Sequence, residues 1–329
     1  MAKTTRVFWY AALLTVFFAS SWQHLAVETA SQPLPAELSV LATIPRSGYG
    51  LDVGFGSVWM MSEGRLARIN LVDNSVIDID IPMEGGASLA DIDKYRGIAV
   101  GEGAVWVPDM GSSTIYKIDP ESNTVVMKIP TDIFGSQGNI GVGEGAIWVV
   151  TFDNRDKTLT RYNAESGAVE AKIVLPRPGK GVLVEGGSIW VTAADQAELY
   201  RIDPTSNQLL STIPINDRSH VLTASDGSVW IGYESDGVVQ RVDGRTGQVI
   251  ATIATGALDM ESDGDITAGG GFVWFITRSS TIAQIEPKTN SLRGIFRTKS
   301  GSVIGRRIRY AGGSLWVSGG SIFRIEGPK

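Results

Sequence analysis

The sequence predicts an all-β protein, a seven-bladed β-propeller with four-stranded antiparallel blades. Three observations predict this fold: a tryptophan phrase that recurs seven times, four short strand-like runs in each repeat, and a last repeat divided between the two ends of the chain. A repeat of about forty residues with strand content is typical of propellers and solenoids. The tryptophans are 40 to 47 residues apart, at Trp59, Trp106, Trp148, Trp190, Trp230, Trp274 and Trp316.

One complete repeat, residues 97–129, contains the four runs. The first two runs form the phrase around Trp106, in which small residues precede an apolar residue and the tryptophan. The third and fourth runs cover residues 114–118 and 124–129. The segment Asp-Pro-Glu-Ser-Asn between the last two has the composition of a hairpin loop, because proline presets φ and asparagine tolerates the left-handed conformation. Four strands in each of seven repeats indicate a propeller.

The last repeat ends one strand short. It stops after the run 321–325, and a matching fourth strand, Leu-Ser-Val-Leu-Ala-Thr-Ile, is found at 38–44. We therefore predict that residues 38–44 join the C-terminal blade and close the ring, which removes exposed sheet edges. A solenoid would need capping repeats instead. The repeated tryptophans are expected to pack between neighbouring blades.

The first residues are typical of an export signal. Two basic residues precede a thirteen-residue apolar run, 7–19, which is short for a membrane span and is followed by small residues. We predict a signal peptide over 1–21, with an uncleaved N-terminal anchor as the alternative, a linker over 22–37 and a single propeller domain over 38–329. The expected location is periplasmic or extracellular. The chain has no cysteine, which excludes disulfides and a lipid anchor on cysteine.

The net charge of the chain argues against some classes of binding partner. Lys and Arg number 29 against 35 Asp and Glu, which gives a formal net charge of −6. An acidic chain argues against general binding to nucleic acid or to an anionic membrane. We therefore expect no nucleic-acid partner, no membrane contact apart from the alternative anchor, and a monomer.

The repeat phrase resembles a known superfamily. Gly-x-Gly-x-Val/Ile-Trp-Val followed by Ile-Asp-Pro-x-Ser/Thr-Asn is similar to the repeats of YVTN-type and streptogramin-lyase-like (virginiamycin B lyase-like) propellers, over residues 38–325. The resemblance implies the propeller fold. It implies no single function, because the superfamily includes lyases, hydrolase-like members and noncatalytic binding proteins.

The tryptophans locate a candidate binding site. The residue ten positions before each tryptophan is expected at the start of an innermost strand, at the rim of a central funnel. These positions hold Tyr49, Arg96, Gly138, Lys180, His220, Gly264 and Arg306, and Arg309 is close to them. Arginine binds carboxylates and phosphates through two hydrogen bonds. We predict a mouth that binds a small anionic molecule, a glycan or a protein; the alternative is surface cations paired with loop acids such as Asp52 and Asp265.

The loop after each tryptophan strand is expected on the same face. Asp109 and Tyr233, three residues past their tryptophans, complete the predicted ligand contacts: Tyr49, Arg96, Asp109, Lys180, His220, Tyr233, Arg306 and Arg309. Streptogramin lyases have a catalytic histidine at a similar strand start, so the resemblance marks His220 as the candidate catalytic residue. They also use a second histidine, a glutamate and magnesium. Here the second histidine, His24, lies in or just beyond the export signal.

We therefore favour a noncatalytic binding protein, and the alternative is a lyase or lactone hydrolase that uses His220 and a divalent metal. Carboxylates alternate around a glycine in one segment, as in calcium loops: Asp259, Glu261, Asp263 and Asp265. The glutamate expected twelve residues into a full calcium loop is replaced by Gly270. The favoured interpretation is a solvated acidic loop without a cofactor, and Mg²⁺ or Ca²⁺ bound by these carboxylates is the alternative.

Overall fold

The computed structural model describes one unit within Pro35–Lys329. The described residues are 36–62, 64–83, 97–109, 112–131, 139–150, 157–217, 221–233, 237–256, 264–277, 281–298 and 307–327. Every regular element in these segments is a β-strand. None of them contains a helix long and apolar enough to cross a membrane.

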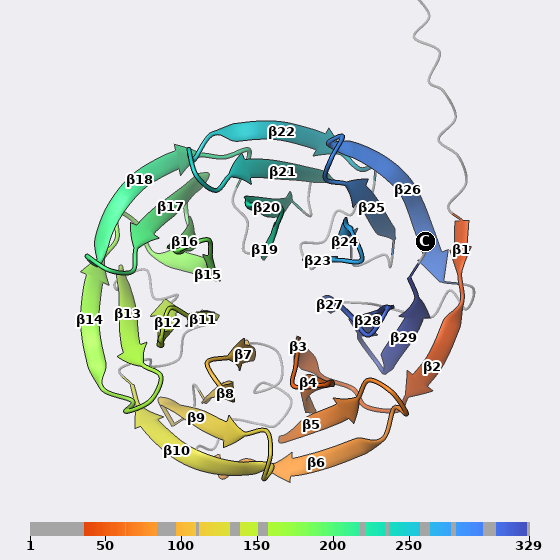
Figure 1. Ribbon diagram of the computed structural model, residues 1–329, viewed down its shortest axis with the longest axis horizontal. Coiled ribbons are helices and arrows are strands. Elements are labelled where there is room, and N and C mark those ends of the chain that lie inside the picture. Colours follow the sequence, from red (N-terminus) through yellow and green to blue (C-terminus); the bar gives the residue numbers. More distant parts are fainter. Residues whose placement is uncertain are drawn as a thin grey trace, which may run out of the picture. The chain divides into compact units, whose positions relative to one another are not determined.

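Seven sheets are arranged in a ring, which confirms the predicted propeller (Figure 1). In each blade the first strand is nearest to the ring axis, and the later strands follow outward. Blades one to three are β3 (Tyr49–Gly54), β4 (Ser57–Ser62), β5 (Arg65–Asn70) and β6 (Val76–Asp80); β7 (Ala99–Gly101), β8 (Ala104–Asp109), β9 (Thr114–Asp119) and β10 (Thr124–Pro130); and β11 (Asn139–Gly143), β12 (Ala146–Val150), β13 (Thr158–Asn163) and β14 (Val169–Val174).

The remaining four blades repeat this order. Blades four and five are β15 (Gly179–Glu185), β16 (Ser188–Ala193), β17 (Glu198–Asp203) and β18 (Gln208–Pro214); and β19 (Val221–Ser225), β20 (Ser228–Tyr233), β21 (Val238–Asp243) and β22 (Val249–Ala254). Blade six is β23 (Asp265–Gly269), β24 (Phe272–Ile276), β25 (Ile282–Glu286) and β26 (Ser291–Thr298), joined by β1 (Ala36–Leu38). Blade seven is β27 (Arg307–Ala311), β28 (Ser314–Ser318), β29 (Ile322–Glu326) and β2 (Val40–Ile44).

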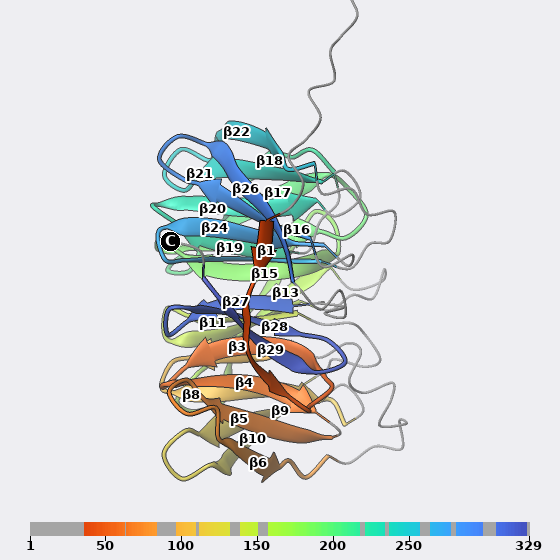
Figure 2. The same cartoon turned by 90° about the vertical axis from the view of Figure 1, so that its right-hand side faces the viewer.

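The ring closes as predicted, with one addition. Strand β2 pairs antiparallel with β29, so Ile44 lies opposite Ile322 and the N-terminal segment completes blade seven. Before it, β1 adds a fifth strand to blade six, parallel to β26, where the sequence predicts the end of a linker. Three residues are too few for a sequence pattern, and their pairing partner is remote in the chain. The segment β1–β2 therefore fastens two blades rather than one (Figure 2).

The seven repeat tryptophans pack between blades, as predicted. All seven are buried. Each indole Nε1 donates a hydrogen bond of 3.0–3.4 Å to the carbonyl oxygen five residues earlier in the chain. Trp106 of blade two, for example, belongs to one apolar cluster with Ile140 and Ile147 of blade three. The tryptophans are therefore structural, with their polar group satisfied.

A cation from the third strand lies over the tryptophan ring in six blades, 4.9–5.3 Å from the ring centroid. These cations are Arg68, Lys117, Arg161, Arg201, Arg241 and Arg324. Each also reaches the next blade. Arg241, for example, donates from Nη1 to Pro287 O at 2.6 Å and to Asn290 Oδ1 at 2.8 Å, both in the turn between the third and fourth strands of blade six. The repeated Asp-Pro-x-Ser/Thr-Asn turn therefore also receives the cation of the preceding blade.

Blade six has no cation over its tryptophan, and ring closure explains this difference. Gln284 lies opposite Trp274, where the other blades have the cation. The next blade, blade seven, takes its fourth strand from the other end of the chain, so no hairpin turn exists there to accept a cation. Tyr310 of blade seven stacks on Trp274 instead, with ring centroids 6.4 Å apart and planes 5° from parallel. Among the described residues, the amide Nε2 of Gln284 has no hydrogen-bond partner.

This difference predicts that equivalent substitutions in blades five and six have different effects on stability. Arg241→Met removes a cation–π contact and charged hydrogen bonds to another blade, so we expect the free energy of unfolding to fall by about 2 kcal/mol. Gln284→Met removes an unsatisfied buried amide, so we expect a change within about 0.5 kcal/mol of zero. Urea unfolding followed by tryptophan fluorescence measures both. Equal losses in the two variants would show that the inter-blade contact of Arg241 does not stabilise the ring.

Candidate functional site

The strand registers define two faces of the ring. The first residues of an inner strand pair with the last residues of the tryptophan strand, as in Val221 with Gly232 and Asp265 with Ile276. The connections between blades and those after the tryptophan strands therefore emerge on the same side, which we call the loop face. The tight turns between first and second strands and between third and fourth strands form the opposite side, the turn face (Figure 2).

Several predicted site residues lie outside the described residues. They are Arg96, Gly138, His220 and Arg306, together with Asp259, Glu261 and Asp263. Of the other positions ten before a tryptophan, Tyr49 begins β3, Lys180 is the second residue of β15, and Gly264 directly precedes β23. For Tyr49 only the backbone is described. All three lie at the loop-face end of an inner strand, which is the position that the tryptophan spacing predicts.

Blade four has the most completely described loop-face connections, residues 175–178 and 194–197. Lys180 is half-buried on β15. Arg177 Nη1 lies 3.6 Å from Asp195 Oδ2, and both side chains are more than 40% exposed, so this pair contributes little stability. Blade four therefore presents both signs of charge at the loop face.

A tyrosine–glutamate pair lies at the start of the third strand of the same blade. Tyr200 Oη donates a hydrogen bond of 2.7 Å to Glu198 Oε2. Burial raises the pKa of the Tyr200 phenol well above its ordinary value of 10, and the Glu198 carboxylate raises it further. Tyr200 therefore stays protonated, and its proton holds Glu198 in place.

Asp109 and Tyr233 end their tryptophan strands and are both buried. Asp109 Oδ2 accepts a hydrogen bond of 2.8 Å from Ser112 Oγ. Tyr233 Oη donates to Gln240 Oε1 at 2.6 Å and accepts from the backbone N–H of Asn216 at 3.3 Å. Burial raises the pKa of Tyr233, so this phenol also stays protonated. These contacts hold loop-face backbone segments in place, and a role for either residue in ligand binding stays a prediction.

Arg309 joins carboxylates from the blades on either side of it. Its Nη1 lies 2.6 Å from Asp265 Oδ2 of blade six, and its Nε lies 3.3 Å from Asp52 Oδ1 of blade one. Both carboxylates also accept backbone N–H groups, from Ile308 at 3.1 Å and from Val100 at 2.8 Å. This Arg309–carboxylate cluster links the inner strands of blades six, seven, one and two.

Burial and ion pairing shift the pKa values of the Arg309–carboxylate cluster in opposing directions. Burial raises the pKa of Asp52 above its ordinary value of 3.8, although Arg309 opposes the shift. Burial also disfavours the charged form of Arg309, but Asp265 and Asp52 together raise its pKa, so it stays cationic. Arg309 is therefore paired with acids, as in the alternative that the sequence offered, but these acids lie on inner strands rather than in loops, and anion binding by Arg309 stays a prediction.

The same cluster bears on the predicted metal site. Asp265, one of the four candidate metal ligands, directs its carboxylate to Arg309 and to the Ile308 N–H. In the described part of the chain, no group of three His, Cys, Asp or Glu side chains is placed to hold a metal ion. A metal at the other three candidate residues stays a prediction, since they lie outside the described residues.

Sequence reasoning did not select Asp52 as a functional residue. A signal was present, because Asp52 and Arg309 lie opposite the tryptophans of blades one and seven, Trp59 and Trp316, in the same register. Opposite charges at equivalent positions of adjacent inner strands indicate a pair, provided that ring closure makes the two blades neighbours.

A family model shows which family the chain belongs to. The chain matches the model described as glutamine cyclotransferase over residues 96–268, more than half of the chain's length. The chain belongs to the glutamine cyclotransferase family. The segment matched by the family model runs from the position directly before blade two to the inner strand of blade six. No curated protein matches the chain in sequence.

Solved structures with the same fold agree with the resemblance seen in the repeats. A streptogramin B lyase structure is 19% identical with a TM-score of 0.71, over 88% of this chain and 96% of that one. A catalytically inactive virginiamycin B lyase from Staphylococcus aureus, with quinupristin, is 17% identical with a TM-score of 0.72, over 89% and 99%. The WD40 propeller domain of Doa1 is 12% identical with a TM-score of 0.67, over 89% and 98%. At these identities the likeness concerns the fold alone.

Proposed function

We propose that this member of the glutamine cyclotransferase family binds a small anionic molecule at the loop face, near the ring axis, and does so without catalysing a reaction. The observation that carries the proposal is positional. Lys180 lies half-buried at the loop-face start of an inner strand. The tryptophan spacing assigns Arg96, His220 and Arg306 to the equivalent positions of other blades.

The chemistry of these side chains favours a carboxylate or a phosphate. Arginine donates two parallel hydrogen bonds to either group, and lysine adds a point charge. The inner strands of the seven blades lie nearest to the ring axis (Figure 1), so one ligand there would be within reach of several blades. A larger ligand with the same acidic groups would be an acidic glycan or a protein partner with clustered carboxylates. The proposal concerns an exported protein, periplasmic or extracellular, in keeping with the predicted signal peptide.

Thermal unfolding tests the binding proposal. We expect citrate, inorganic phosphate or an oligouronate to raise the Tm, because a ligand at a hundredfold excess over its Kd adds about 2.7 kcal/mol to the free energy of unfolding. Arg96→Ala and Lys180→Ala should each weaken binding of the same anion about tenfold in calorimetric titrations. Arg245→Ala, on the turn face, is the matched control and should bind normally. No response to any of these anions, or an equal loss in the control, would contradict the proposal.

Family membership favours a second candidate, catalysis of cyclotransfer on glutamine. Such a reaction needs a group that accepts a proton and a group that donates one. His220 is the candidate base, and Asp195 and Glu198 are described carboxylates on the same face. Release of ammonia from peptides with N-terminal glutamine, lost in His220→Ala and retained in Arg245→Ala, would establish catalysis. That result would overturn the noncatalytic proposal but leave anion binding open, since the two assays are independent.

A further inference from the structure

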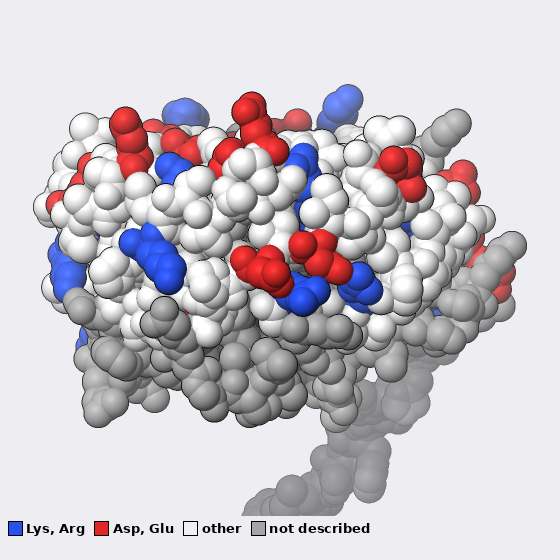
Figure 3. All heavy atoms as spheres, turned by 90° about the horizontal axis from the view of Figure 1, so that it is seen from below, with Lys and Arg blue, Asp and Glu red and all other residues white. Residues whose placement is uncertain are grey.

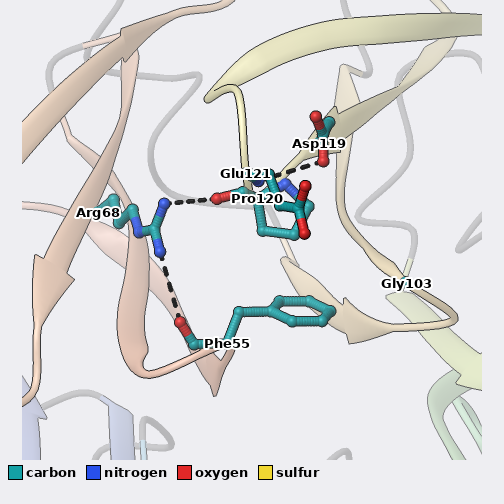
Figure 4. A pocket seen from close by; sticks show the side chains of 6 residues that line it. All are labelled: Phe55, Arg68, Gly103, Asp119, Pro120 and Glu121. Atoms are coloured by element: carbon teal, nitrogen blue, oxygen red, sulfur yellow. Dashed lines mark hydrogen bonds between the residues drawn. The ribbon is translucent and has the colours of Figure 1, made fainter.

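A cavity of about 450 Å³ lies on the turn face between blades one and two (Figure 4). Its lining comes from the first turn of each blade, from β5 and from the turn after β9: Phe55, Arg68, Gly103, Asp119, Pro120 and Glu121. The Phe55 ring lies below Pro120 and Glu121 and points toward the turn that contains Gly103 (Figure 4). None of these residues belongs to the loop face, so the cavity is separate from the proposed anion site.

Phe55 is an unusual residue for its position. It has a φ of 51°, and the equivalent first-turn residues of the other blades have the same left-handed conformation. Those residues are Glu102, Glu144, Gly186, Asp226, Gly270 and Gly312. A bulky aromatic residue rarely adopts a positive φ. The residue is also 43% exposed. The fold needs neither the ring nor its exposure here, because six other blades form the same turn without an aromatic residue.

The charge around the cavity is negative. Arg68 lies over the Trp59 ring, and its Nη1 donates to Pro120 O at 2.5 Å and to Asn123 Oδ1 at 2.8 Å, which holds its guanidinium in the blade interface. The two carboxylates of the lining, Asp119 and Glu121, outnumber this cation. Hydrogen bonds from Ser122 lower the pKa of Asp119 below its ordinary value of 3.8, so this carboxylate is ionised at neutral pH. Glu121 is exposed beside it.

Acidic residues are also frequent on the turn face around the cavity. Acidic residues in its described turns and adjoining strand ends include Asp73, Glu102, Asp119, Glu121, Glu144, Glu165, Asp203, Asp226, Asp243 and Glu286. The basic residues within these turns are Arg245 and Lys288. Six third-strand cations also reach the turns and donate hydrogen bonds to neutral oxygens there: Arg68, Lys117, Arg161, Arg201, Arg241 and Arg324. Asp and Glu side chains are visible along this edge of the ring in Figure 3. A cationic partner would therefore be attracted to the turn face before it reached the cavity.

We propose that this cavity binds an arginine side chain of a partner polypeptide. The guanidinium would lie against the Phe55 ring, where the ring quadrupole attracts a cation, while Asp119 and Glu121 supply carboxylate acceptors at the rim. The volume is within the range of small-ligand sites and accommodates one such side chain. This binding role would explain why an exposed aromatic residue in a strained conformation is found at position 55, where the fold does not need one.

The test is an NMR titration of the isotope-labelled full chain with acetyl-Gly-Arg-Gly-amide. The matched probe is the same peptide with citrulline, which has nearly the same shape but no charge. We expect the arginine peptide to shift amide signals of residues around 55, 103 and 121, and the citrulline peptide to bind about tenfold more weakly or not detectably. Equal binding of both peptides, or no shifts at these residues, would overturn the proposal.

Two variants separate recognition from folding. Phe55→Gly relieves the positive φ, so the free energy of unfolding should stay the same or rise while binding of the arginine peptide weakens about tenfold. Glu121→Gln should weaken binding by a smaller factor, and Glu144→Gln, at the corresponding face of blade three, is the control that should bind normally. A loss of stability in Phe55→Gly with unchanged peptide affinity would show that Phe55 is structural and that the cavity is not an arginine site.

Discussion

A chain that begins at residue 46 is expected to lose cooperative folding at ambient temperature. It lacks β1 and β2, so β29 and β26 each expose an unpaired edge. It also loses the buried side chains Leu38 and Ile44. Each contributes about 1.5–3 kcal/mol by burial, and the strand hydrogen bonds add to this. The net stability of a domain is about 5–15 kcal/mol, so the loss is a large part of the total. Denaturant unfolding measured by tryptophan fluorescence is the appropriate measurement.

The matched control is a chain that begins at residue 36, which keeps both strands and should unfold cooperatively. A synthetic peptide of residues 36–45, added in excess to the shorter chain, should restore part of the lost stability. If the two chains had the same unfolding midpoint, the N-terminal segment would not close the ring in solution.

Replacing Arg309 with leucine is expected to lower the free energy of unfolding by about 3 kcal/mol at neutral pH. The substitution removes the cation that Asp52 and Asp265 share, and breaking a buried ion pair from one side is strongly destabilising. The expected loss lies at the lower end of the range for buried pairs, because the Arg309 and Asp52 side chains are about a quarter exposed. The exposed Arg245→Leu is the control and should change stability by less than about 0.5 kcal/mol.

The pH dependence of this loss identifies its cause. A carboxyl whose pKa is raised in the folded state stabilises the fold when it is protonated, so this contribution appears as the pH falls through the folded-state pKa. The pKa of Asp52 is already raised by burial, and loss of the Arg309 charge should raise it further. The deficit of Arg309→Leu should therefore be largest at neutral pH and shrink in acid. Adding Asp52→Asn and Asp265→Asn should recover much of the loss. A deficit independent of pH would assign it to packing instead.

Most of the fold could be predicted because its information is local and repeated. The tryptophan phrase, the alternating strands and the Asp-Pro turns each recur within one repeat, so seven copies confirm one another. The missing last strand was recognisable at 38–44 by its likeness to the fourth strands of other repeats. Strand β1 was not predicted, since three residues contain no period and their partner, β26, lies more than 250 residues away in the chain.

The candidate site could be predicted only by position. Counting back from the tryptophans correctly located Lys180 at the start of an inner strand, but it does not give the partners of a charge. The structure places Arg309 between two carboxylates, and its role as a ligand contact stays a prediction. The cavity at Phe55 also had a signal in the sequence, an aromatic residue where other repeats have Glu, Asp or Gly. That signal had no interpretation until the turns of two blades were seen to enclose one space.

The sequence by itself determined the all-β class, the number of blades, the order of strands and the turns, because these follow from periods and turn chemistry within about forty residues. The tertiary structure alone decided which charges neutralise one another across the blades. Arg309 and Asp52 are 257 positions apart and become neighbours only when the ring closes. The same closure removes a hairpin from blade seven and leaves Gln284 where other blades have a cation. These two features depend on residues more than 200 positions apart, so the pattern of a single repeat does not contain them.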